Sequence, residues 1–157
     1  GNVEYAERIA STIIGDELIY YTKDRYGLRL DKYADGVVME EPLVLICNEN
    51  SASSSEILLG AVQAHKAGTI VGTTSFGKGI IQSVMNFPEG DGLQVTVAQY
   101  FTPDDKTIHG VGVTPDVEVA LAEDAYGENG QLIPEKDNQL STAVEVLMEQ
   151  LEADKAA

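Results

Sequence analysis

The sequence predicts an α/β domain built on a strand, helix, strand unit, with β-hairpins before and after it in the chain. An apolar run at 43–47 precedes a helical pattern at 57–65, and a second apolar run follows at 69–73. Short runs rich in β-branched residues are typical of buried parallel strands. The order of these elements favours a parallel crossover, so this unit is expected to form the centre of the fold.

The segments before this unit predict a helix and a hairpin. Apolar residues recur at helical spacing within 2–14. Alternating runs at 17–22 and 28–33 flank turn-forming residues at 24–27, which is the pattern of a β-hairpin. After the central helix, Gly68 is expected to adopt the left-handed conformation that ends it.

The second half of the chain predicts a longer hairpin and a final helix. Residues 80–87 and 93–100 flank a turn rich in proline and glycine at 88–92. A linker at 122–134 is rich in glycine, glutamate and asparagine. The spacing of the apolar residues beyond it predicts an amphipathic helix that starts at 137–138.

The composition is that of a globular domain with a sizeable core. The 157 residues are 43% apolar and 23% charged, and no apolar run approaches the roughly 20 residues of a transmembrane helix. The net charge of −16 argues against nucleic acid as a partner, because its phosphates would be repelled. The one cysteine, Cys47, lies in an apolar run and is expected to pack in the core.

The residues between the first apolar run and the central helix are the first candidates for chemistry. The segment 48–57 has the sequence Asn-Glu-Asn-Ser-Ala-Ser-Ser-Ser-Glu-Ile. A sharp turn from a strand into a helix can present a nucleophilic side chain, with free N–H groups of the first helical turn facing a developing oxyanion. The same serines are ordinary helix caps, and a glutamate in the first turn also fits a capping box.

A lysine between two glycines is the second candidate. The segment 74–82 has the sequence Thr-Ser-Phe-Gly-Lys-Gly-Ile-Ile-Gln and places Lys78 among apolar residues. Because apolar surroundings disfavour an ammonium ion, a lysine in such a setting can act as a neutral base and accept the proton of a serine. Gln82 lies four residues further on, where its amide can hold the lysine in place.

Together the two segments resemble the carboxyl-terminal processing peptidases, also called tail-specific proteases, which are serine peptidases with a Ser-Lys dyad. The serine turn of that family reads Asn-Glu-Gly-Ser-Ala-Ser-Ala-Ser-Glu-Ile, and its lysine motif reads Thr-Phe-Gly-Lys-Gly-x-x-Gln. The separation of Ser53 from Lys78 is also the usual one in the family. Asn50, Ser54 and Ser75 depart from the family sequence, and none of these changes replaces a reacting group.

The resemblance implies a role for five residues. Ser53 would be the nucleophile, Lys78 the general base and Gln82 the residue that orients the lysine. The backbone N–H of Ser54, with a second N–H from a glycine turn at Gly1, would stabilise the oxyanion. No cofactor or metal is implied, and the acidic turns of the chain lack the spacing of metal ligands.

The resemblance also implies a ClpP/crotonase-like mixed sheet with helices and β-hairpins, truncated at its N-terminus. Gly1 would be the last glycine of the Arg-Asn-Pro-Gly-Gly motif that precedes the first helix in the family. Residues 1–121 would form a partial catalytic domain, and 122–157 a linker and an amphipathic helix packed on or beside it. The family implies protein substrates with unstructured, apolar C-termini, and a PDZ domain in the parent protein. It also implies that the protein works outside the cytoplasm, and an oligomer is possible.

There are three alternatives to a Ser-Lys peptidase. A Ser-His pair would need His65, roughly 18 Å along the helix from Ser53, or His109 beside a glycine turn, and both are expected to be packed or solvated. A non-catalytic module of the same fold would bind peptides without cutting them. An acyl-CoA enzyme of the crotonase kind would not need the serine and lysine, and the acidic surface suits an anionic CoA poorly.

Overall fold

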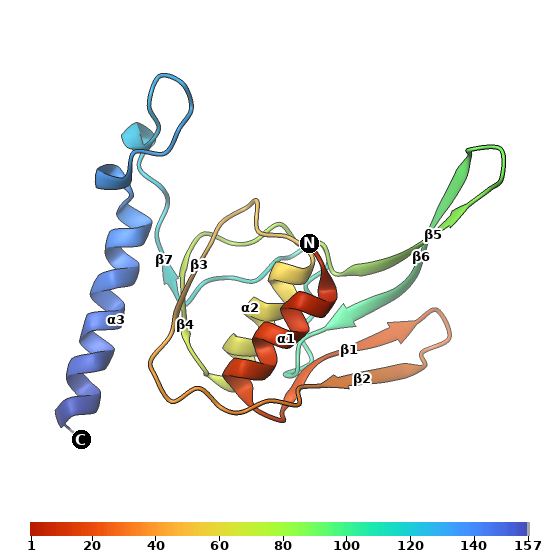
Figure 1. Cartoon of the computed structure of the whole chain (residues 1–157), viewed down its shortest axis with the longest axis horizontal. Coiled ribbons are helices and arrows are strands. Elements are labelled where there is room, and N and C mark those ends of the chain that lie inside the picture. The colour runs from red at the N-terminus through yellow and green to blue at the C-terminus, as the bar shows by residue number, and fades with distance from the viewer. Residues whose placement is uncertain (157) are drawn as a thin grey trace.

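The computed structural model describes residues 1–156 and contains two sheets, with two helices in the centre of the molecule (Figure 1). The smaller sheet is parallel and contains, in spatial order, β3 (Val44–Cys47), β4 (Thr69–Gly72) and β7 (Val117–Glu118). The larger sheet is antiparallel and contains, in spatial order, β2 (Arg29–Tyr33), β1 (Leu18–Asp24), β6 (Gly92–Phe101) and β5 (Ile80–Asn86). The predicted α/β class is confirmed, with parallel and antiparallel strands in separate sheets.

The parallel sheet is formed by a crossover through α2 (Ser54–His65). β3 and β4 pair in parallel, from Val44 opposite Thr69 to Cys47 opposite Gly72, and β7 adds to the other side of β4. The parallel unit expected at the centre of the sequence is therefore confirmed. Because α2 begins a few residues after β3 ends, the sheet and the helix together fix the position of the turn between them.

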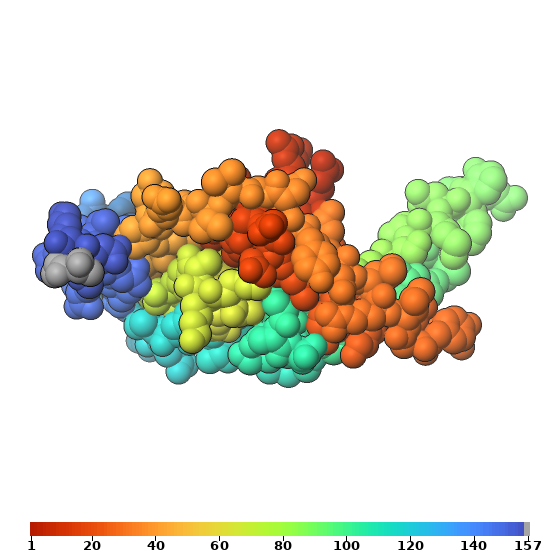
Figure 2. Space-filling view, turned by 90° about the horizontal axis from the view of Figure 1, so that it is seen from below, coloured from red at the N-terminus to blue at the C-terminus, as the bar shows by residue number. Residues whose placement is uncertain are grey.

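Both predicted hairpins are present in the antiparallel sheet. β1 pairs with β2 on one side and with β6 on the other, and β6 also pairs with β5. The β5–β6 hairpin extends beyond the rest of the sheet and projects from the body as the green arm in Figures 1 and 2. Apolar side chains are exposed along this arm, namely Val84, Met85, Phe87, Leu93, Val95 and Val97.

The core lies where α1 (Val3–Ile14) and α2 pack against each other and against the strands. Asn2 caps α1, since its Oδ1 accepts the N–H of Glu4 at 2.9 Å. The buried apolar residues of this core include Ala10, Ile13, Ile14, Ile57, Ala61, Val62 and Ile70. The chain after β2 passes so close to α1 that a Cβ on Gly36 would lie 1.8 Å from the carbonyl oxygen of Ser11, so glycine is required there.

The C-terminal end of α2 differs from the sequence prediction. Lys66, and not Gly68, adopts the left-handed conformation, with φ of 54°. The N–H of Ala67 donates to the carbonyl of Val62 at 3.0 Å, which closes the helix end. Gly68 has a packing role instead, because a Cβ there would lie 2.9 Å from the carbonyl oxygen of Leu43. Lys66 is exposed, so its long side chain extends into solvent despite the unusual backbone.

The chain beyond β7 returns along the parallel sheet. It forms two short 3₁₀ helices and a last α-helix: η1 (Glu123–Ala125), η2 (Pro134–Lys136) and α3 (Asn138–Ala156). The side-chain amide of Gln139 donates to the carbonyl of Val119 at 2.7 Å, and that of Gln150 donates to Thr69 Oγ1 at 2.7 Å. The predicted final helix is confirmed, and it lies beside the parallel sheet (Figure 1). Within residues 1–156, no helix has the length and apolar character needed to cross a bilayer.

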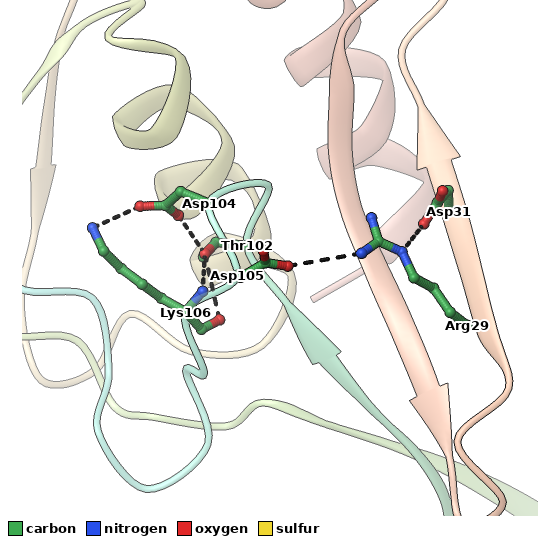
Figure 3. Close-up of polar contacts among 6 residues, drawn as sticks. All are labelled: Arg29, Asp31, Thr102, Asp104, Asp105 and Lys106. Carbon is green, nitrogen blue, oxygen red and sulfur yellow. Dashed lines mark hydrogen bonds and ion pairs between the residues drawn. The ribbon is translucent and has the colours of Figure 1, made fainter.

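A hydrogen-bonded turn closes the end of β6 (Figure 3). The hydroxyl of Thr102 donates to the Asp104 carboxylate at 2.6 Å and accepts the N–H of Lys106 at 3.0 Å. Lys106 pairs with Asp104 at 2.7 Å, and Arg29 of β2 reaches Asp105 at 3.7 Å. Asp105 has a positive φ of 63°, which short polar side chains tolerate better than most. These contacts anchor the end of β6 that lies nearest to the centre of the molecule.

The packing of β4 generates a stability prediction. Ile70 is fully buried in the core, so Ile70→Ala is expected to lower the free energy of unfolding by about 2–5 kcal/mol. Urea unfolding followed by circular dichroism measures this loss. Ile9→Ala is the matched control, because Ile9 is 48% exposed on α1 and its loss should change the free energy by less than about 1 kcal/mol. Equal losses in the two variants would contradict the proposed core.

Candidate active site

The turn between β3 and α2 holds Ser53 in a strained backbone conformation. Ser53 is the N-cap of α2 and has φ of 59° and ψ of −112°. A positive φ is rare for a residue other than glycine and costs on the order of 1–3 kcal/mol. Strain of this kind persists only where surrounding contacts hold it, and it recurs at the sharp strand-to-helix turns that present nucleophiles. The contacts that hold Ser53 are therefore informative about the site.

A buried carboxylate joins the serine turn to the lysine segment. Glu56 is 0% exposed, and its carboxylate accepts four hydrogen bonds. Oε2 accepts the N–H of Ser53 and the N–H of Lys78, both at 2.8 Å. Oε1 accepts the hydroxyl of Ser75 and the N–H of Gly77, both at 2.6 Å. One side chain thus fixes the backbones of both residues that the sequence analysis selected as nucleophile and base.

The lysine segment is held on its other side by a glycine-containing turn. Ser75 exchanges hydrogen bonds with Val113, whose N–H donates to Ser75 Oγ at 2.7 Å and whose carbonyl accepts the N–H of Ser75 at 3.1 Å. The N–H of Phe76 donates to the carbonyl of Ser51 at 3.0 Å. Gly77 adopts a φ of 90°, in which a side chain would be strained. The segment before Lys78 is therefore clamped between two other parts of the chain.

Ser53, Lys78 and Gln82 line one cavity of about 440 Å³. Its other walls are mostly apolar, with the lining residues Val3, Tyr20, Ile57, Ile80, Ile81, Gln94 and Tyr100. The Oε1 atom of Gln82 accepts the side-chain amide of Gln94 at 2.8 Å. The structure therefore brings the predicted nucleophile, base and orienting residue to the same cavity. The contact that Gln82 was expected to make with the lysine stays a prediction.

The two predicted oxyanion donors also lie side by side. Ser54 is the first residue of α2 and is 5% exposed, and the N–H of a first helical residue has no acceptor within its own helix. Gly1 packs against it so closely that a Cβ on Gly1 would lie 2.3 Å from Ser54 Oγ. The positive end of the helix dipole adds to the preference for negative charge at this point. Their role as oxyanion donors stays a prediction.

The two histidines lie outside this cavity. Nε2 of His65 is 2.7 Å from the carbonyl oxygen of Leu18, at the opposite end of α2 from Ser53. His109 is exposed and its backbone packs against Gly79, where a Cβ would lie 2.5 Å from the N atom of His109. Neither is among the residues that line the cavity. Lys78 therefore shares the cavity with Ser53, and the two histidines do not.

Cys47 occupies the end of β3, just before the serine turn. It is 3% exposed, and its thiol lies 3.3 Å from the carbonyl oxygen of Thr73. Burial, with a smaller contribution from the negative charges of Asp116 and Glu56, raises the pKa of the Cys47 thiol to about 11. Because the thiolate is the nucleophilic form of cysteine, this residue serves packing and not catalysis, as expected.

Sequence reasoning missed the central role of Glu56. The spacing of Ser53 and Glu56 fits a capping box, and this signal accounts for the hydrogen bond from Ser53 N–H. The other three donors come from the lysine segment, which is remote in the sequence, so nothing in the local pattern indicates them. The residue that organises the site was therefore visible only as a helix cap.

The four hydrogen bonds to Glu56 generate a second prediction. Glu56→Gln replaces acceptor oxygen by an NH₂ group that faces N–H donors, so it is expected to lower the free energy of unfolding by about 2–4 kcal/mol. Urea unfolding measures the change. Glu49→Gln is the matched control, since Glu49 is exposed and bonds Thr73 Oγ1 at 3.3 Å, and it should cost less than about 1 kcal/mol. If Glu56→Gln leaves the free energy of unfolding unchanged, the carboxylate does not hold the site together.

Most of the chain matches a known family of proteins. The family model of peptidase family S41 matches residues 1–119. The chain is 42% identical over 109 residues to a carboxyl-terminal-processing protease of Synechocystis, which covers 69% of this chain and 26% of that protein. It is 43% identical over 106 residues to the chloroplastic carboxyl-terminal-processing peptidase 3 of Arabidopsis thaliana, covering 66% of this chain and 20% of that protein.

Solved structures agree with these matches. The photosystem II D1 C-terminal processing protease superposes with a TM-score of 0.71 at 36% identity, over 76% of this chain and 32% of that chain. A peptidase structure from Parabacteroides merdae has a TM-score of 0.72 at 18% identity over 94% of this chain, a likeness that shows the fold alone. The chain spans about a fifth to a third of the length of the carboxyl-terminal processing proteases named above. Because the family model matches well over half of the chain and includes every residue that lines the cavity, the chain belongs to peptidase family S41.

Proposed function

We propose that this chain carries the catalytic site of a carboxyl-terminal processing serine peptidase, with Ser53 as nucleophile and Lys78 as general base. One observation carries the proposal. The N–H groups of Ser53 and Lys78 donate to the same oxygen of the buried Glu56, and both side chains line one cavity. Two candidates chosen from remote parts of the sequence are thus held together by a shared acceptor.

The proposed reaction is a two-step acyl transfer. The neutral amine of Lys78 takes the proton of Ser53 Oγ as this oxygen attacks the scissile carbonyl carbon. The N–H of Ser54, with a second N–H at Gly1, stabilises the negative charge on the carbonyl oxygen. The protonated lysine then gives its proton to the leaving amine, and an ester between Ser53 and the substrate remains. A water molecule that loses its proton to Lys78 hydrolyses the ester and restores the serine.

The surroundings of the dyad support this chemistry and point to a class of substrate. Apolar side chains make up most of the cavity walls, and a lower local dielectric constant strengthens electrostatic interactions with a developing oxyanion. An apolar side chain next to the scissile bond would bury its surface against Ile57, Ile80 and Ile81. By the family resemblance, the proposed substrates are protein chains with unstructured, apolar C-termini, and no cofactor is implied.

The family resemblance supplies further proposals about the full-length protein. Carboxyl-terminal processing proteases of bacteria and of chloroplasts are among the matched relatives. By that likeness we propose action outside the cytoplasm, and a PDZ domain that delivers substrate tails to the cavity. Oligomer formation is compatible with the exposed apolar residues of the β5–β6 arm. Each of these belongs to the whole protein and depends on the peptidase function proposed above.

The nucleophile assignment predicts that Ser53→Ala removes proteolysis. Cleavage of β-casein or of an apolar-tailed peptide by the full-length protein should fall by about 10³-fold or more, because the acyl-enzyme can no longer form. Ser55→Ala is the matched control, since Ser55 is exposed in the same turn and should keep at least half of the activity. Equal cleavage by wild type and Ser53→Ala would show that the activity does not depend on Ser53. No cleavage by wild type would favour a peptide-binding module.

The base assignment predicts that Lys78→Met also abolishes cleavage while the fold is kept. Methionine preserves much of the length and apolar stem of lysine but accepts no proton. Labelling of Ser53 by a fluorophosphonate should slow by about 10²-fold or more, because activation of the hydroxyl is lost. Lys66→Met, at the exposed far end of α2, should label and cleave like wild type. If Lys78→Met labels at the rate of wild type, another group is the base.

A further inference from the structure

The hydroxyl of one buried tyrosine contacts the backbones of both proposed catalytic residues. Tyr100 lies near the end of β6, is 2% exposed and packs edge-on against Tyr20, with ring centroids 6.3 Å apart. Its hydroxyl is within hydrogen-bond distance of two carbonyl oxygens, that of Ser53 at 3.1 Å and that of Lys78 in a shorter contact. The main chain of Tyr100 adds a third link, because its N–H donates to the carbonyl of Gly79 at 3.0 Å.

The two carbonyl oxygens depend on this hydroxyl to different degrees. The Ser53 carbonyl also accepts the N–H groups of Glu56 at 2.9 Å and Ile57 at 3.1 Å, which belong to the first turn of α2. The hydroxyl has a single proton to donate, and its shorter contact is with Lys78. Removing the hydroxyl should therefore loosen the lysine segment more than the serine turn.

The surroundings of the phenol keep it a donor. Burial and the nearby negative charge of Glu56 both raise the pKa of Tyr100 above its ordinary value. The proton on the hydroxyl is therefore retained at any pH at which the protein would work. Lys78 is thus fixed through its N–H by Glu56 and through its carbonyl by Tyr100.

We infer that Tyr100 is a positioning residue, which sets the separation of Ser53 and Lys78 by binding the main chain of both through one hydroxyl. The inference rests on the proposed function, since the separation matters for turnover only if these two residues are nucleophile and base. The hydroxyl of Tyr100 bonds main-chain carbonyl oxygens and not Ser53 Oγ or Lys78 Nζ. Its effect is carried by the backbone, and a displacement of about 1 Å in such a pair can cost on the order of 10²-fold in rate.

The test compares Tyr100→Phe with Tyr21→Phe in the full-length protein. Tyr21 is also a 2% exposed tyrosine of the antiparallel sheet, and it stacks on Phe101 at 5.1 Å, away from the cavity. Tyr100→Phe is expected to lower kcat by about 10- to 100-fold and to leave KM within about twofold. Tyr21→Phe is expected to change neither. Urea unfolding of both variants shows whether they are folded under the assay conditions.

Amide hydrogen exchange reports on the backbone without any turnover. The N–H groups of Gly77 and Lys78 should exchange at least about tenfold faster in Tyr100→Phe than in Tyr21→Phe, because the carbonyl of Lys78 has lost its hydrogen bond from the Tyr100 hydroxyl. Faster exchange with unchanged kcat would overturn the inference, as would an equal loss of kcat in both variants. If wild-type cleavage does not depend on Ser53, the proposed function is wrong. The exchange result then shows only whether Tyr100 stabilises the backbone of the lysine segment.

Discussion

The site depends on the buried carboxylate of Glu56. Among the residues that the structure describes, none of its hydrogen-bond partners is a cationic group. Glu56 is compensated by three main-chain N–H groups and one hydroxyl, drawn from the serine turn and the lysine segment. Burying a carboxylate is costly unless such donors surround it, so the carboxylate and the two segments stabilise each other or fail together. This mutual dependence makes the main-chain positions of Ser53 and Lys78 a property of the fold.

The strain at Ser53 is explained by the same contacts. Its N–H is held by Glu56, and its carbonyl accepts from the N–H groups of Glu56 and Ile57 and from Tyr100. A residue bound on both of its peptide groups cannot relax to an ordinary φ without losing several hydrogen bonds. These contacts therefore hold the strained turn in place, as a pre-organised site requires.

Much of the fold and part of the site could be predicted from the sequence, because their signals are local. The crossover, both hairpins and the last helix follow from periodicity, and the Ser53 and Lys78 segments stand out through small residues and glycines. The left-handed end of α2 was misassigned to Gly68, because glycine is needed there for close packing against Leu43, which only the fold reveals. The bonds of Glu56 and Tyr100 to the lysine segment join residues about 20 positions apart, and no pattern in one segment encodes them.

The burial of Cys47 has a consequence for how the chain tolerates oxidants. Oxidation to a sulfenic acid and exchange with disulfides both begin with the thiolate, and a thiol with a pKa of about 11 contains very little of it at neutral pH. A chain with a single, protonated and inaccessible thiol can fold and persist in an oxidising compartment without forming mixed disulfides. The turn that holds Ser53 therefore follows a cysteine that is shielded from the oxidants of its surroundings.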